Sequence, residues 1–292
     1  MAADRQHFLP AALLGGFGRP DPRCRSARYA TIAVRDLATG NVRCSNALSE
    51  AHRRALYRLE APPPGVDPDV VDKIWDQIEP GLPELVRRVE RQALIADDEG
   101  KLLDYAASVW VRHPSFSDVA ARHQASRGEP VPTGDAVQVM RVEALRDLRK
   151  IVPTWRWRVL HACADAPRMV ISDLGFIVIA DHPGGDETAA LRYAVFLPLS
   201  PRVGLLAYMD HHSLPSRRPI FSEHRDVVPS WVEWLNACAT SRDRGTLIEP
   251  RAVFGHPDDT VALRVLPDAK RVRPNAYGPF RGAGMSAATL LD

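Results

Sequence analysis

The chain has 292 residues, 45% of them hydrophobic and 25% charged, which is ordinary for a globular protein of one large or two modest domains. A net charge of +2 does not itself point to a nucleic acid, although uneven placement of arginine can still create a basic face. The four cysteines lie far apart without a C-x-x-C pair, which argues against zinc and a secreted disulfide framework, so we expect a cytoplasmic protein.

An apolar segment over residues 8–17 follows His7. Such a segment offsets its ordering entropy only by docking into the core, which would hold His7 at a fixed position. The alternative is an ordinary buried imidazole bonded to a backbone carbonyl. Pro10 and the Gly15-Gly16 pair interrupt the segment, so we expect no signal peptide. No window approaches the roughly 18 apolar residues of a membrane helix, so we expect no membrane partner.

The next elements are a hairpin and a helical block. Residues 29–34 predict a strand, and the turn at 36–41 joins it to a second strand at 42–44. Residues 49–59 predict a helix, and Asp67-Pro68 starts another whose apolar spacing reaches Ile78. Helical spacing then dominates, so that about residues 48–151 form a predicted helical layer.

The periodicity changes after residue 155. Short β-branched or aromatic runs at 155–160, 168–171, 176–179, 192–196 and 203–208 predict a mostly antiparallel sheet within about residues 155–266. Residues 228–239 predict a helix, and the Gly/Pro/Arg-rich tail 267–292 is expected to be partly disordered. Separate blocks of helices and strands predict an α+β fold with a docked N-terminal segment and hairpin, in one domain spanning 1–292.

Candidate chemistry begins with one carboxylate and one guanidinium. The chain contains no Gly-rich nucleotide loop, zinc-protease motif or hydrolase elbow. Glu79 ends an apolar helical face, where burial would shift its pKa toward general acid/base use; a solvated helix end is the alternative. Arg112 ends an apolar run and needs an anionic ligand, unless it forms a structural ion pair with Glu79.

Other candidates follow the predicted strands. Ser172-Asp173 and Asp181-His182 stand at strand ends, where side chains leave the sheet, although Asp is equally common in turns. The adjacent His211-His212 pair would point to opposite sides of a strand, so we expect no metal site and no other cofactor.

A basic segment interleaved with aromatic residues spans residues 146–161. This composition suits phosphate contact and base stacking, whereas core tryptophans with arginines on a solvated strand face would give the same pattern. The candidate RNA-binding residues are Arg146, Arg149, Lys150, Arg156 and Arg158.

Together these residues resemble the family known as domain of unknown function 4238. Its members open with a Gln/His-His-aromatic-x-Pro pattern, which Gln6-His7-Phe8-Leu9-Pro10 matches. The similarity extends to about Phe254, through the segments 29–34, 57, 78–79, 112–116, 196–201 and 234–236. Two features depart from the family: Ser172-Asp173 and Asp181-His182-Pro183 each keep half of a Ser-Asp-Asn-Pro motif, and Asp72 replaces a common Glu.

Fungal proteins similar to this family include arginine-using cyclodipeptide synthases, which draw activated amino acids from aminoacyl-tRNA. The resemblance therefore implies an aminoacyl transferase that forms an amide bond, with a small amino-acid-like substrate and a charged tRNA as partners. Such a reaction needs a base, carboxylates for the amine and dipoles for the oxyanion. The implied catalytic residues are His7, Glu79, Asp173 and Asp181, and the implied substrate-binding residues are Arg112, His113, Ser172 and Asn236.

Two alternatives remain at this point. A metal-dependent nuclease or other defence-related hydrolase would use the acidic residues and the basic surface, but the chain lacks a D…E-x-K signature. A binding module for RNA or protein would need no catalytic residue. The sequence does not indicate the oligomeric state.

Overall fold

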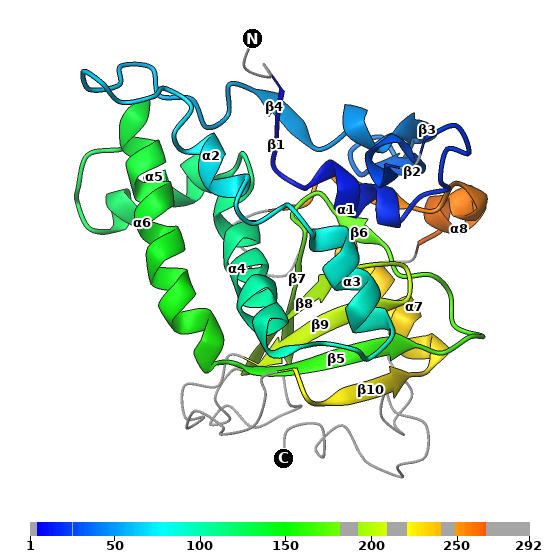
Figure 1. Cartoon of the computed structure of the whole chain (residues 1–292). Coiled ribbons are helices and arrows are strands. Elements are labelled where there is room, and N and C mark those ends of the chain that lie inside the picture. Colours follow the sequence, from blue (N-terminus) through cyan, green and yellow to red (C-terminus); the bar gives the residue numbers. More distant parts are fainter. Residues whose placement is uncertain (1–4, 25, 182–191, 209–220, 241–248, 267–292) are drawn as a thin grey trace.

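The computed structural model describes residues 5–24, 26–181, 192–208, 221–240 and 249–266, and its fold class is α+β, as predicted. The helical layer is formed by short α2 and by longer helices that pack beside the main sheet (Figure 1). These helices are α2 (Asp72–Trp75), α3 (Leu82–Glu90), α4 (Ala96–Arg112), α5 (Phe116–Ser126) and α6 (Asp135–Ile151). The predicted tail 267–292 lies outside the described residues.

The main sheet has five strands in the order β10-β5-β9-β8-β7. Its strands are β5 (Arg156–Ala162), β7 (Ile177–Asp181), β8 (Arg192–Pro198), β9 (Val203–Tyr208) and β10 (His224–Val227). All neighbours are antiparallel except β10 and β5, which are parallel. The mostly antiparallel sheet expected from the sequence is therefore confirmed, except that the run at 168–171 does not join this sheet and that β10 was not expected.

Alternate residues of this sheet enter two different cores. Val195 and Leu197 of β8 pack with the helical layer, whereas Ala194 and Phe196 pack with α7 (Pro229–Ala239) on the other face. Both faces of the central strands are thus buried, which explains why β8 and β9 are nearly continuous apolar runs.

A second, antiparallel sheet has the strand order β3-β2-β11-β6, so strands from near the beginning and near the end of the described residues lie side by side. It contains the predicted hairpin, β2 (Thr31–Asp36) and β3 (Val42–Asn46), beside β11 (Ala252–Gly255) and short β6 (Ile171–Ser172). The pairing of β11 with β2 was not expected from the sequence. Helix α8 (Thr260–Arg264) follows β11, and single 3-10 turns occupy Ala27–Tyr29, Ala47–Ser49, Val152–Thr154 and Pro257–Asp259.

The expected helix over residues 49–59 is wrong. Residues His52–Arg54 instead form β4, which pairs antiparallel with β1 (Arg5–His7). Ala51 and Ala55 flank β4 with φ angles of 49° and 51°, a left-handed conformation that a right-handed helix does not contain. Long-range pairing with β1 therefore overrides the local helical pattern. The expected helix from residue 67 is also shorter, since only α2 forms there.

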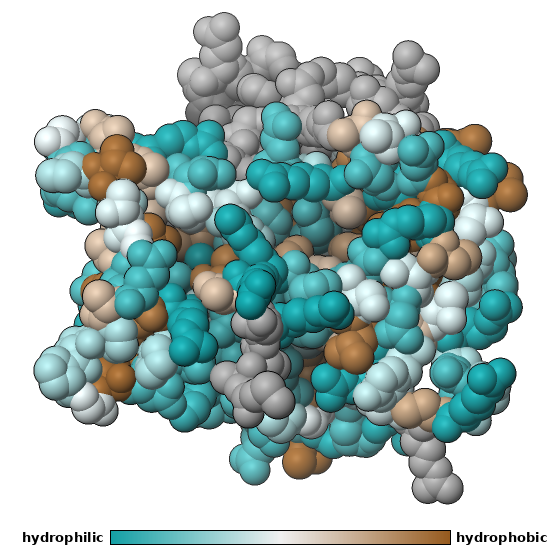
Figure 2. Space-filling model, turned by 90° about the horizontal axis from the view of Figure 1, so that it is seen from above, coloured by the Kyte–Doolittle hydropathy of each residue, from teal (hydrophilic) through white to brown (hydrophobic). Residues whose placement is uncertain are grey.

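The N-terminal segment docks as predicted. After β1 the chain forms α1 (Ala11–Gly16), and Leu9, Leu13, Leu14 and Phe17 are at most 2% exposed. Strands β1 and β4 lie on the upper side of the molecule in Figure 1, and Figure 2 shows that this side is mostly hydrophilic with scattered hydrophobic residues. In the part of the chain that the structure describes, no helix is long and apolar enough to span a bilayer.

Candidate functional site

The buried guanidinium of Arg112 joins three segments that are distant in sequence. Arg112 is the last residue of α4 and is 1% exposed. Its Nη2 atom donates to the Glu79 carboxylate and, at 2.7 Å, to the His7 carbonyl oxygen. Its guanidinium also lies 5.1 Å from the centre of the Trp75 ring. The structure thus brings His7, Glu79 and Arg112 together, including the Arg112–Glu79 ion pair considered from the sequence.

A hydrogen bond to Leu48 determines which nitrogen of the His7 imidazole carries the proton. Its Nε2 lies 3.1 Å from the Leu48 carbonyl oxygen, which can only accept, so Nε2 carries the proton. In the neutral ring, Nδ1 then holds the lone pair. Burial lowers the pKa of His7, as do the nearby charges of His52 and Arg112, while the Leu48 bond and Glu79 act in the opposite direction. His7 is therefore a neutral proton acceptor near pH 7.

Asp72, in α2, is surrounded by more carboxylates than cations: Asp76 and Glu79 lie near it, and Arg112 is the nearby cation. Burial raises the pKa of Asp72 to about 6, with Asp76 and Glu79 adding to the rise and Arg112 and a hydrogen bond from Gln6 opposing it. Glu79 follows α2 in a turn, and its side chain is 33% exposed. The site therefore combines a neutral imidazole with an acidic surface that reaches solvent through Glu79, which suits a cationic amine.

Tyr57 and Arg141 hold the end of α4 that presents Arg112. The Tyr57 hydroxyl donates to the Arg112 carbonyl at 2.7 Å, and Arg141 Nη1 donates to the Val111 carbonyl and, at 3.4 Å, to that of His113. A cation at a helix C-terminus interacts favourably with the helix dipole. Burial lowers the pKa of Arg141 to about 10. Neither residue was expected to be functional, because no local sequence motif marks a helix cap that a distant segment supplies.

Several buried polar atoms around Tyr57 have no hydrogen-bond partner among the described residues. These atoms are Arg112 Nε and Nη1, Arg141 Nε, Tyr105 Oη, Trp75 Nε1 and Gln138 Oε1. Most of them are donors, and buried donors without partners are energetically unfavourable. The interior next to Glu79 is therefore rich in donors, while its solvent side is acidic.

His113 and Asp173 form a second pair next to Arg112. His113 Nδ1 accepts from the Ser115 backbone N–H at 3.1 Å, so Nε2 carries the proton and faces Asp173 Oδ2 at 3.5 Å. The other Asp173 oxygen accepts from the Arg251 backbone N–H. The Phe8 and His113 rings pack edge to face, with their centres 5.2 Å apart. The N-terminal segment thus touches both pairs.

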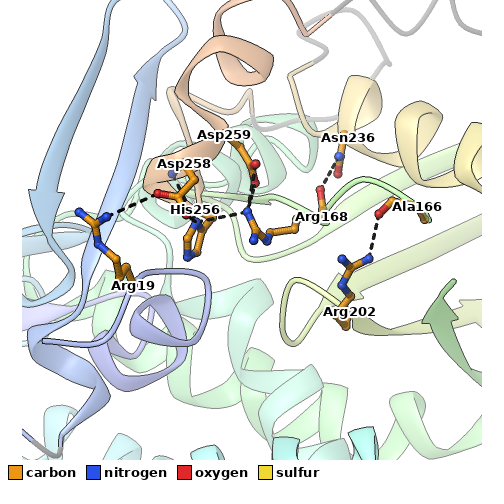
Figure 3. Close-up of polar contacts among 8 residues, drawn as sticks. All are labelled: Arg19, Ala166, Arg168, Arg202, Asn236, His256, Asp258 and Asp259. Atoms are coloured by element: carbon orange, nitrogen blue, oxygen red, sulfur yellow. Dashed lines mark hydrogen bonds and ion pairs between the residues drawn. The ribbon is translucent and has the colours of Figure 1, made fainter. Parts of the chain in front are cut away.

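Ser172 and Asn236 make backbone contacts. The Ser172 hydroxyl donates to the Phe176 carbonyl within the turn after β6. The Asn236 amide accepts from Val170 N–H and donates to the Arg168 carbonyl, which fastens α7 to the chain before β6 (Figure 3). Asn236 and Arg168 also line a cavity of about 330 Å³, together with Pro167, Val170, Glu233, Asp259, Ala262, Leu263, Val265 and Leu266. None of the residues lining this cavity belongs to the group around Arg112.

Asp181 ends β7, at the far end from the turn that contains Asp173. Its side chain and the neighbouring His182 and Pro183 lie outside the described residues, as do His211 and His212. Among the residues that the structure does describe, no three His, Cys, Asp or Glu side chains are grouped as metal ligands.

The basic segment lies on α6 and β5, and its charges are paired with acids. Arg146 and Lys150 contact Asp147, Arg149 contacts Asp104, and both Arg156 and Arg158 contact Glu223. Trp155 and Trp157 stack with each other, and Trp157 is 2% exposed. A role of these residues in RNA binding remains a prediction, but the paired charges leave a weaker basic surface than the sequence suggested.

The architecture and site define an α+β protein whose N-terminal segment contacts a buried arginine that is paired with a partly exposed glutamate. The family model described as "Protein of unknown function (DUF4238)" matches residues 5–242, and the chain belongs to this family. No curated protein and no solved structure matches the chain.

Proposed function

We propose that the chain is an enzyme that forms an amide bond by aminoacyl transfer, with aminoacyl-tRNA as the activated donor. One observation carries this proposal: a neutral imidazole, His7, stands beside a solvent-reaching carboxylate, Glu79, that a buried guanidinium holds in place. An amine that attacks an ester must lose a proton, and these are the groups that bind its ammonium form and remove that proton.

The reaction can be written in terms of these groups. Glu79 and the half-buried Asp72 hold the ammonium group of the acceptor amino acid, and His7 Nδ1 takes its proton. The resulting amine attacks the ester carbonyl of the aminoacyl donor and a C–N bond forms. The nitrogen then releases its second proton to solvent as the C–O bond to the tRNA ribose breaks. The departing ribose oxygen receives the proton from His7. No oxidant, reductant or external energy source is needed, because the ester is already activated.

The other predicted residues take supporting roles in this proposal. Arg112 is too buried to meet a substrate freely, so it positions Glu79 and the His7 backbone. Asp173 orients His113. Because charged tRNA is a cytoplasmic substrate, we place the protein in the cytoplasm.

The test is mass spectrometry of small products after the purified chain is incubated with charged tRNA and amino acids. Native protein should yield a new amide product, and His7→Asn and Glu79→Gln should reduce it at least a hundredfold. The matched controls are His123→Asn and Glu84→Gln, which make the same changes on the exposed faces of α5 and α3. Absence of any amide product from native protein, or equal yields from His7→Asn, would refute the proposal.

A further inference from the structure

The cavity of about 330 Å³ lies between α7, α8 and the chain just before β6, and it shares no residue with the group around Arg112. Its volume is at the lower end of the range for small-molecule sites. A buried water needs about two to four polar partners, which apolar walls do not supply. Six of the ten lining residues are apolar, so the cavity suits an apolar group better than water: Pro167, Val170, Ala262, Leu263, Val265 and Leu266.

One side of the cavity is buried and the other reaches solvent. Val170 and Leu263 are 6% and 1% exposed and form its inner part. Glu233 and Val265 are exposed and form its mouth. A ligand that covered Val265 would remove apolar surface from water, which is favourable. The cavity therefore fits a ligand whose apolar body lies inside and whose polar end lies near the mouth.

Hydrogen bonds hold the walls of the cavity in place. Asn236 of α7 donates to the Arg168 carbonyl at 2.8 Å (Figure 3) and accepts from the Val170 N–H at 3.0 Å. Arg35 of β2 donates to the carbonyl oxygens of Leu263 at 2.9 Å and Leu266 at 3.5 Å, which fixes the C-terminal end of α8. A site with ordered walls loses less conformational entropy when a ligand binds.

The charged residues of the cavity leave one carboxylate without a partner. Arg168 Nη1 donates to both oxygens of Asp259 at 3.1 Å, so these two charges offset each other (Figure 3). Glu233 lies three residues before Asn236 on α7 and forms no hydrogen bond or ion pair with any described residue. With Arg168 positive and Asp259 and Glu233 negative, the lining residues carry one net negative charge. A cation complements this charge.

We infer that the cavity between α7 and α8 binds a small organic ammonium ion with an apolar body. The ammonium group binds the Glu233 carboxylate at the mouth, and the apolar body packs against Val170 and Leu263. A carboxylic acid of the same shape would place its negative charge beside Glu233, and a zwitterionic amino acid would add a carboxylate to a cavity that already has two. The inference does not depend on the proposed function.

The test compares three ligands that carry an aromatic ring on a two-carbon chain and differ in charge. These are phenethylamine, the zwitterion phenylalanine and the anion 3-phenylpropionate, each titrated into the full ¹⁵N-labelled chain at neutral pH and followed by NMR. Phenethylamine should shift the amide signals of α7 and α8. It should bind about tenfold more tightly than 3-phenylpropionate, with phenylalanine between the two.

Two variants assign the binding to the cavity. Glu233→Gln should weaken phenethylamine binding about tenfold, because a charge-assisted hydrogen bond becomes a neutral one. The matched control is Glu143→Gln, the same change at an exposed position of α6, which should bind as native protein does. Ala262→Phe fills the mouth and should abolish binding, whereas Ala125→Phe, at an exposed alanine of α5, should not.

Four results would overturn the inference: equal affinities in Glu233→Gln and Glu143→Gln, 3-phenylpropionate binding as tightly as phenethylamine, phenylalanine binding more tightly than phenethylamine, or shifts confined to residues around Glu79. The proposed function also places an ammonium group at Glu79, so the positions of the shifted signals separate the two sites. A chain that binds phenethylamine at Glu233 and forms no amide would refute the proposed function and leave this site intact.

Discussion

At the scale of single residues, Arg112 determines the arrangement of the site. Its position after an apolar helical run made burial expected, but the identity of its partners depends on the fold. Glu79 was the carboxylate weighed from the sequence, whereas the His7 carbonyl and the Trp75 ring were not anticipated. Backbone acceptors and ring faces carry no sequence signal, so the sequence offered the ion pair as one of two alternatives and did not indicate the other groups around Arg112.

Removal of the Glu79 charge should destabilise the fold. Glu79→Gln leaves the buried Arg112 cation without a carboxylate, and we expect the free energy of unfolding to fall by about 1–3 kcal/mol, since Glu79 is partly solvated. Urea unfolding measures this change. Glu84→Gln, in an exposed pair with Arg87, should change it far less, and equal losses in the two variants would contradict the assignment.

Asp72 should make stability depend on pH. Its folded pKa of about 6 lies above the ordinary value of 3.8, so the folded state holds a proton that the unfolded state releases between these values. Stability contributed by this group therefore falls as pH rises from about 4 to about 6, and the penalty remains at higher pH. We expect Asp72→Asn to be more stable than native protein at pH 8, by on the order of 1 kcal/mol, and equally stable near pH 4. A pH-independent difference in chemical unfolding would count against a raised pKa.

At the scale of elements, α1 shows how closely the N-terminal segment approaches the rest of the chain. A Cβ atom added to Gly15 would lie 1.8 Å from the Ala27 carbonyl oxygen, whereas one added to Gly16 would meet nothing within 4 Å. Two neighbouring glycines in one short helix thus have different constraints. The sequence marked both as interruptions of an apolar segment and gave no means to distinguish them.

This difference gives a matched pair of variants. Gly15→Ala should lower the free energy of unfolding by more than about 2 kcal/mol, because the α1 backbone must move away from Ala27. Gly16→Ala should raise it by about 0.5–1 kcal/mol, because alanine favours the helix and has room. Thermal unfolding of both variants provides the measurement, and similar melting temperatures would show that α1 does not dock as described.

At the scale of the whole molecule, local patterns predicted the α+β class, four of the five strands of the main sheet and the docking of the N-terminal segment. They failed where pairing joins distant segments. Residues 52–54 became a strand because β1 lies beside them, and β11 joined β2 across more than two hundred residues. The same limit applies to the site: His7, Glu79 and Arg112 were selected by residue type, but Tyr57 and Arg141 acquire their roles only through the fold.

The most direct test of the catalytic account is the rate of amide formation between pH 5 and 9 in native protein and in His7→Asn. Burial lowers the pKa of His7 below its ordinary value of 6.5, and the base works in its neutral form. The native rate should therefore fall as pH drops through a pKa below 6.5 and reach a plateau above it, while His7→Asn should lose about 10²- to 10⁴-fold in rate together with this pH dependence. A His7→Asn protein that keeps the native rate and pH profile would contradict the account.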